Sequence, residues 1–311
     1  MALFPVPILT NGATHSAQQF RMMVRDLVSG AEGITQGTDL KVAQLGTPGT
    51  SVQVSDGSGV VRGRVSAFQG TYSVCNIGAA TVPIAATGAS GRSDMVILRI
   101  EDPEYEGNRN PETDQINFFQ VISGVSSSAT TIPDGRTGIP LARIDIPAST
   151  STITNAMIKD IRQIANPRRD RQQLTFSPAG TSTSINNTNG VYTYFSTVPG
   201  WNIAIPDWAT TVCVRIDIAQ IKYSVAAFTG LLRATFGASL TLQPVILDDN
   251  QTAIRRQVAV VADTLTIPAA YRGTTQLLRP QAAGTTGNVG TVAVDGSTTL
   301  IADIEFVEAP R

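Results

Sequence analysis

A long succession of short apolar runs, separated by turn residues, limits the fold of this chain more than any other feature of its sequence. Residues 94–100 are almost continuously apolar, which is typical of a strand buried on both faces. Turn signals, such as residues 248–250 and 295–296, separate several of the runs. Many short strands with turns between them predict a sandwich or barrel, and we expect jelly-roll-like topology in the C-terminal part.

The candidate strands follow one another along the sequence after residue 50. In the N-terminal half they are residues 52–54, 60–65, 94–100, 116–122 and 139–146. In the C-terminal half they are residues 191–196, 211–223, 233–247, 254–262, 265–267, 275–278, 289–294 and 300–307. The pattern is therefore that of a mainly β protein.

One amphipathic helix is predicted ahead of these strands, at residues 14–29. Its apolar residues have helical spacing and are Ala17, Phe20, Val24, Leu27 and Val28. Thr14 or Ser16 can cap its start, and Gly30 can end it. A second, shorter helix or turn is expected at residues 154–164.

A charged segment, residues 166–173, breaks helices and has no apolar periodicity, so we place a domain boundary there. The predicted domains are residues 1–165, a linker at residues 166–174, and residues 175–311. The first is expected to be an α+β domain with one helix. The second is expected to be an antiparallel β-sandwich that presents an interaction surface, because loops on a rigid sandwich often carry binding sites.

Composition limits the partners of the chain. Its formal net charge is −1 and only 15% of its residues are charged, so no global charge points to nucleic acid. A neutral surface rich in Thr and Ser fits permanent contacts between subunits, and it fits a plain soluble β domain equally well. The N-terminus lacks the basic segment of a signal peptide, and no apolar run approaches the length of a membrane span. We expect a soluble protein, made in the cytoplasm of a host cell.

The residues that carry most catalytic and metal chemistry are scarce. His15 is the single histidine and lies at the predicted helix entry, so neither a Ser-His-Asp triad nor a usual zinc site can be assembled. Cys75 and Cys213 lie in apolar strand-like runs, where buried free thiols are expected. The polar loop 101–114 could hold a cation, but its carboxylates match no known calcium-loop spacing and a solvated loop is favoured.

Glycan hydrolysis needs only two carboxylates, so it is the one enzymatic function to weigh against a structural role. Candidates in the C-terminal half are Asp207, Asp217, Asp248, Asp249, Asp263, Asp295, Asp303 and Glu305. Most of them lie in turns or alternate with apolar residues, and aromatic residues make up only 6% of the chain. We therefore predict no enzyme, with no catalytic residue, cofactor or metal. Trp201 and Trp208 are candidates for contact with a glycan, although packing in the core is the more common use of tryptophan.

The N-terminal half carries an ordered set of motifs. They are residues 9–17, the helix with Arg21 and Asp26, residues 39–43, 51–55, 59–63, 70–74, 91–100, 138–142 and 153–162. In this order they resemble the N-terminal domain of bacteriophage baseplate and tail-tip proteins, of the upper-baseplate or minor-tail kind. The resemblance covers about half of the chain. Within it, Arg92 and Asp94 resemble the Arg-x-Asp strand of the family, and Asp160 and Arg162 resemble its closing segment.

The resemblance implies an assembly module that docks on the phage tail and often trimerises. Arg92, Asp94, Asp160 and Arg162 would then be structural ion pairs, whereas on an exposed loop they would be ordinary surface charges. The implied protein is a structural component of the virion, with other tail proteins, itself as a homotrimer or ring, and a host surface glycan as partners. A capsid fibre or decoration subunit and a glycan-degrading tail enzyme are the alternatives.

Overall fold

The computed structural model describes residue 4 and residues 6–311, and it divides the chain into two compact units. Unit 1 consists of Met1–Pro167 together with Ala309–Arg311, and unit 2 consists of Arg168–Glu308. The chain therefore passes between the units twice, after Pro167 and after Glu308. The last three residues belong to unit 1, although we expected them in the C-terminal domain.

Unit 1 contains three antiparallel sheets around one core. Sheet β1-β4-β5 is formed by Gly33–Ile34, Gly57–Arg62 and Thr71–Asn76. Sheet β10-β9-β7-β8 is formed by Ile158–Asp160, Gly138–Ile146, Arg92–Ile100 and Asn117–Val125. Sheet β2-β3-β6 is formed by Val42–Gln44, Ser51–Val54 and Ala80–Pro83. Strand β7 pairs on both sides and is buried along almost its whole length, as its continuous apolar run predicted.

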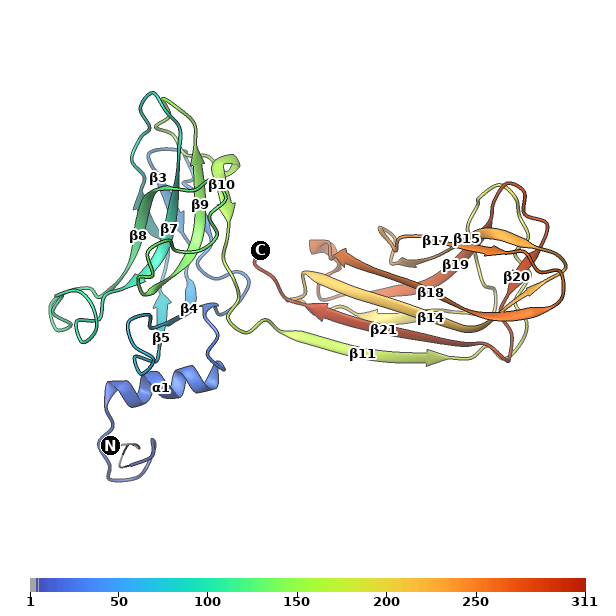
Figure 1. The fold of residues 1–311 in the computed structure, drawn as a ribbon, viewed down its shortest axis with the longest axis horizontal. Helices are drawn as coiled ribbons and strands as arrows, with labels where there is room; N and C mark the ends of the chain where they lie inside the picture. The colour runs from blue at the N-terminus through green and yellow to red at the C-terminus, as the bar shows by residue number, and fades with distance from the viewer. Residues whose placement is uncertain (1–3, 5) are drawn as a thin grey trace. The chain divides into compact units, whose positions relative to one another are not determined.

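The predicted N-terminal helix is confirmed as α1, Ala17–Leu27, and it lies beside β5 (Figure 1). The backbone N–H of Gln19 donates to the Ser16 hydroxyl, and the Gln19 side chain accepts from the backbone N–H of Ser16. This reciprocal cap fixes the start of the helix. The helix ends at Val28, and Gly30 follows with a φ of +72°, a conformation that favours glycine.

The second helix or turn, expected at residues 154–164, is present only as a short turn. Only Asn155–Met157 forms a helical turn, of the 3-10 type, and Ile158–Asp160 then forms strand β10. The spacing of the isoleucines in this segment imitates a helical period. Pairing of β10 with β9 along the sheet edge satisfies the backbone instead, and this contact was not visible in the local sequence.

Unit 2 is a sandwich of two antiparallel sheets. The first has the order β11-β21-β14-β18, formed by Arg169–Phe176, Thr299–Val307, Thr211–Ser224 and Arg255–Thr266, with β20, Thr291–Ala293, also paired to β14. The second has the order β12-β19-β15-β16, formed by Thr193–Tyr194, Thr275–Gly284, Phe228–Phe236 and Leu240–Thr241. In this sheet β13, Trp201–Ala204, also pairs with β19, and β17, Val245–Asp249, also pairs with β15.

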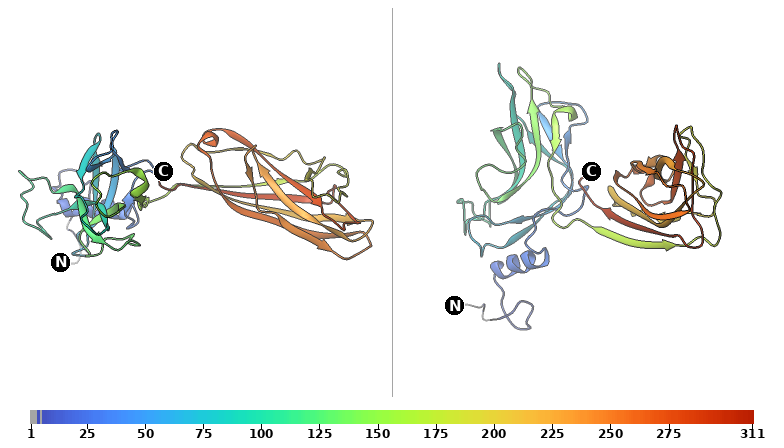
Figure 2. Two further views of the ribbon diagram at one scale, coloured as in Figure 1. Left: turned by 90° about the horizontal axis from the view of Figure 1, so that it is seen from above. Right: turned by 45° about the vertical axis from the view of Figure 1, so that its right-hand side comes forward.

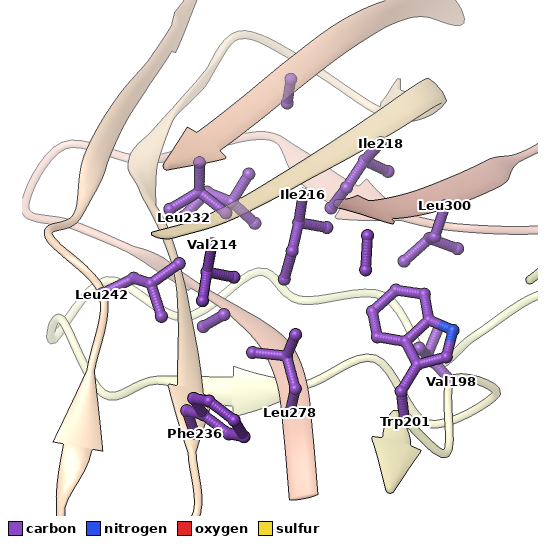
Figure 3. Close-up of a cluster of buried hydrophobic side chains, with 14 of the residues drawn as sticks. Val198, Trp201, Val214, Ile216, Ile218, Leu232, Phe236, Leu242, Leu278 and Leu300 are labelled. Carbon is purple, nitrogen blue, oxygen red and sulfur yellow. The ribbon is translucent and has the colours of Figure 1, made fainter. Parts of the chain in front are cut away.

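The strand order identifies the predicted jelly roll. If β12 and β13, β16 and β17, and β20 and β21 are each taken as one interrupted strand, the sheets have the orders 1-8-3-6 and 2-7-4-5. These are the two four-stranded sheets of a double Greek key. The strands surround one interior (Figure 2, right), and β21 and β15 alternate strictly between buried and half-buried residues. The inward residues form the core of unit 2, part of which is shown in Figure 3.

Two further expectations need correction. The expected linker, residues 166–174, lies mostly in strand β11, which pairs with β21 along its whole length. Its polar residues are exposed on an edge strand, so the segment lacks the apolar run that usually reveals a strand. The free thiol of Cys75 is exposed and that of Cys213 is half-buried, because strand alternation turns both away from the neighbouring core valines.

Candidate assembly and binding surfaces

The first suspected ion pair joins residues two positions apart on strand β7. The Arg92 guanidinium donates from Nε to Asp94 Oδ1 and Oδ2 at 2.9 and 3.0 Å, and the Asp94 side chain is fully buried. Arg92 also donates to the backbone carbonyls of Ala85 and Ala86. Asp94 accepts from the backbone N–H of Gly124 at 3.1 Å. The pair therefore holds the segment after β6 and the end of β8 against the start of β7.

The second pair has the same two-residue spacing with the order reversed. Arg162 donates from Nη2 to Asp160 Oδ2 at 2.6 Å, and its own side chain is fully buried. It also donates to the backbone carbonyls of Asp39 and, at 3.1 Å, Arg311. One buried guanidinium thus joins β10, the turn before β2 and the C-terminal residues within unit 1. Residues i and i+2 of an extended chain share a face, which explains why both pairs are local.

Helix α1 is attached to unit 1 through Arg21. Its guanidinium donates to the Gln69 carbonyl at 2.8 Å and to Glu104 at 2.7 Å, and lies 3.3 Å from Asp102. It also lies 5.4 Å from the ring centre of Tyr72, whose hydroxyl donates to Asp102 at 2.7 Å. Burial is the largest of the causes that raise the pKa of Tyr72 far above its usual range, so this hydroxyl remains a donor. The anchor is polar and leaves the apolar residues of the helix uncommitted.

No residue of α1 is fully buried, and apolar side chains are exposed around it. Phe20 and Leu27, two helical turns apart on one face, are 43% and 73% exposed. Phe68 is exposed as well. It lies beside the helix, where its backbone carbonyl accepts a hydrogen bond from the Gln18 side chain at 3.0 Å. Leu9 is exposed as well and donates from its backbone to His15, whose ring packs edge-on against Phe20. We call Leu9, Phe20 and Leu27 the α1 surface.

An open hollow of about 800 Å³ lies at the C-terminal end of α1. Its charged lining residues are Arg25, Asp26, Arg62 and Arg64. Arg64 pairs with Glu32, whereas Arg62 has no ion-pair partner among residues 4 and 6–311.

The outer face of the first sheet of unit 2 carries a ladder of ion pairs. Arg171 lies 2.5 Å from Asp303 across β11 and β21, and Arg169 lies 3.3 Å from Glu305. Arg215 donates to Asp217 at 2.9 Å on β14. The Arg171 guanidinium lowers the pKa of Asp303 below its ordinary value. Every arginine on this face is therefore already neutralised by a carboxylate.

The outer face of the second sheet is different, because its arginines lie against tyrosine rings. The Arg233 guanidinium is 3.7 Å from the ring centre of Tyr192, and that of Arg279 is 4.5 Å from the ring centre of Tyr194. Within residues 4 and 6–311 neither arginine has a carboxylate partner. We call Tyr192, Tyr194, Arg233, Arg279 and Thr235 the Tyr–Arg face. Sequence reasoning missed it, since the three strands that form it meet only in the folded sheet.

Five of the eight candidate catalytic carboxylates are in ion pairs with arginine. Asp217, Asp303 and Glu305 belong to the ladder on the first sheet, and Asp249 pairs with Arg255. Asp295 lies 2.7 Å from Arg256, which lowers the pKa of that carboxyl. The general acid of a glycosidase requires a raised pKa.

The two tryptophans do not offer open rings to a sugar. Trp201 is 9% exposed and packs in the core near Val198 and Leu300 (Figure 3), so its expected contact with a glycan does not fit the structure. Trp208 is half-buried against the same core, and the Arg168 guanidinium lies 5.2 Å from its ring centre. Both rings therefore serve packing within unit 2.

Residues 4 and 6–311 contain no group of three or more His, Cys, Asp or Glu side chains that could hold a metal ion. In the polar loop after β7, Glu101 lies 2.6 Å from Arg109 and Glu106 lies 3.0 Å from Arg99. Arginine thus occupies the position that a cation would take. None of the helices described in residues 4 and 6–311 is long and apolar enough to span a membrane.

No family model and no curated protein sequence matches the chain. Among solved structures, one of infectious bursal disease virus, Gx strain, aligns with 93% of this chain and 87% of that chain at 12% identity and a TM-score of 0.25. The VP2 subviral particle of infectious bursal disease virus aligns with 93% of this chain and 86% of that chain, at 11% identity and a TM-score of 0.25. A Bacillus thuringiensis Cry1Da tryptic core variant aligns with 98% of this chain and 57% of that chain, at 11% identity and a TM-score of 0.16. TM-scores this low carry no inference about function.

Proposed function

We propose that this chain is a structural protein of a bacteriophage tail tip or baseplate, in which unit 1 attaches to the particle and unit 2 presents an adhesive surface. The ordered motifs of the N-terminal half support the assignment to a tail. The observation that carries the proposal is helix α1, in which no residue is fully buried and the apolar Phe20 and Leu27 are exposed.

An amphipathic surface helix normally buries its apolar face against its own domain. In unit 1, Arg21 supplies a polar anchor, while Phe20 and Leu27 remain exposed. Leaving such side chains in water forfeits about 1.5–3 kcal/mol each relative to full burial. An apolar patch that a fold maintains at this cost is expected to be covered by another protein.

The chemistry of unit 2 supports a binding role. Its jelly roll is an architecture that occurs in viral capsid proteins and in lectins, although fold alone does not define function. Its candidate catalytic carboxylates are mostly in ion pairs with arginine. Unit 2 therefore acts as a rigid presenter of surface, without turnover of a substrate.

Assembly as a homotrimer or ring follows from the same surface. The α1 surface is exposed on unit 1, where it can meet a neighbouring copy or another tail protein. Light scattering of the full chain should show an oligomer. The Leu27→Asp variant should reduce it to monomer, while Val289→Asp, at an exposed valine of unit 2, should leave it intact.

Electron microscopy of virions labelled with an antibody to the chain tests the location. Label at the tail tip supports the proposal. Label spread over the capsid would replace it with the alternative of a capsid decoration subunit. Absence of the chain from purified virions would overturn a structural role in the particle.

A further inference from the structure

We propose that the Tyr–Arg face of unit 2 binds a polysaccharide that carries carboxylate groups. Most arginines of the chain are in ion pairs, whereas Arg233 and Arg279 meet on this single face without one. The inference rests on the proposed function, in which unit 2 is adhesive, and it names the class of ligand.

The register of the sheet brings these residues together. Tyr194 on β12 lies opposite Gln281 on β19, and Gln281 lies opposite Arg233 on β15. Arg279 lies opposite Thr235 in the neighbouring row. The residues that alternate with Arg233 on β15 are fully buried, so the row itself faces outward.

Both guanidiniums are held in position by groups other than carboxylates. Arg279 donates from Nε to the Val198 carbonyl at 2.7 Å, and Arg233 donates from Nε to the Gln281 amide oxygen at 2.8 Å, with the amide oriented by its hydrogen bonds. Each arginine also lies against a tyrosine ring. Within residues 4 and 6–311, Nη1 of both arginines has no hydrogen-bond partner. Fixed cations with spare donors are preorganised for an anionic ligand.

The opposite face of the sandwich shows what an occupied arginine surface looks like. There Arg169, Arg171 and Arg215 each pair with a carboxylate of the chain itself. An anion that approached that ladder would have to displace an existing partner. Charge complementarity therefore directs an acidic ligand to the Tyr–Arg face.

The remaining groups on this face favour a sugar over an acidic peptide. The Tyr194 ring is 39% exposed, and sugars bind the flat faces and edges of such rings. The hydroxyls of Tyr194 and Thr235 lie 3.1 Å apart and can exchange hydrogen bonds with the hydroxyls of a sugar. A uronate polymer provides hydroxyls and carboxylates along one chain, which matches both kinds of group.

Binding of the purified full chain to immobilised polygalacturonate tests the inference. We expect binding to polygalacturonate, weaker binding to neutral dextran, and weaker binding to poly-L-glutamate. Arg233→Gln combined with Arg279→Gln should lower the affinity by about tenfold or more, because each change removes a charged donor. The matched control is Arg169→Gln combined with Arg171→Gln on the opposite face, which should leave the affinity unchanged.

Two further variants separate binding from folding. Tyr194→Phe keeps the ring and should retain most of the affinity, whereas Tyr194→Ala should lose it. Arg279→Lys keeps the charge in case Arg279→Gln loosens the loop that Val198 belongs to, and the melting temperature of each variant identifies such loosening.

Equal binding of the double arginine variant and the unmodified chain would overturn the inference, as would equal binding to dextran or no binding to polygalacturonate. Binding to poly-L-glutamate at least as tight as to polygalacturonate would replace the sugar by an acidic protein partner. None of these outcomes bears on attachment through unit 1, which the Leu27→Asp variant tests separately.

Discussion

The two units hold their strands together by different means. Unit 2 has long strands, such as the 14 residues of β14, whose alternating residues meet in one apolar core. Unit 1 has many shorter strands and long connections, and the buried arginines of the described chain, Arg99 and Arg162, both belong to it. Guanidiniums that reach backbone carbonyls fix segments that have no strand partner. Where strands are long, as in unit 2, apolar packing can hold them together. Where strands are short, as in unit 1, buried arginines add further contacts.

The largest effect is expected from a change in the core of unit 2. Phe236→Ala removes a fully buried ring and should lower the free energy of unfolding of unit 2 by about 3–5 kcal/mol. Hydrogen exchange should show the loss of protection in residues 168–308. Thr241→Ala, at an exposed position of the same sheet, is the control. Equal loss of protection in unit 1 would contradict a separate core in each unit.

In unit 1, the two members of one ion pair should differ in importance. Asp160→Ala leaves the fully buried Arg162 guanidinium without its carboxylate, which should cost about 3–5 kcal/mol. Arg162→Met leaves a carboxylate that water can reach and fills the same space with apolar atoms, so its cost should be smaller. Thermal unfolding of both variants measures the difference. The reverse order would mean that the carbonyl contacts of Arg162 outweigh the charge.

A smaller and local effect is expected at the anchor of α1. Arg21→Ala removes the hydrogen bonds to Gln69 and Glu104. Loss of each of these charge-assisted bonds should lower the free energy that holds α1 on unit 1 by about 1.5–3 kcal/mol. Hydrogen exchange in α1 should accelerate while the sheets of unit 1 stay protected. Arg25→Ala, on the same helix but half-exposed, should change exchange much less.

The smallest effect is the dependence of stability on acid. The Arg256 guanidinium is the main cause that holds the pKa of Asp295 below its ordinary value of 3.8. A lowered folded pKa means that this carboxylate stabilises unit 2 above its unfolded pKa and ceases to do so as the pH falls through the folded value. Asp295→Asn should therefore be less stable than the unmodified chain at pH 7. The gap should narrow below pH 3.8, as urea unfolding at several pH values can show. A difference in unfolding free energy between Asp295→Asn and the unmodified chain that does not change with pH would exclude a contribution from titration of Asp295.

The predicted elements that hold in the structure are those with a strong local period. Helix α1 and strand β7 are visible in the sequence because their apolar residues follow a regular local pattern, with helical spacing in α1 and a continuous run in β7. The edge strands β10 and β11 are not, because one half of an edge strand faces water and its residues are polar or mixed. The suspected pairs of Arg92 with Asp94 and Asp160 with Arg162 could be predicted from the sequence for a related reason. Each pair spans only two residues of one strand or its end.

The sequence by itself determined the mainly β class, the helix ahead of the strands and the scarcity of histidine and cysteine chemistry, since all of these follow from composition and short-range spacing. Only the tertiary structure decided that residues 309–311 return to unit 1, that Trp201 is enclosed, and that Arg233 lies against Tyr192 and Arg279 against Tyr194. Those facts depend on which strands pair. Strand pairing joins residues far apart in the chain, and no local period encodes it.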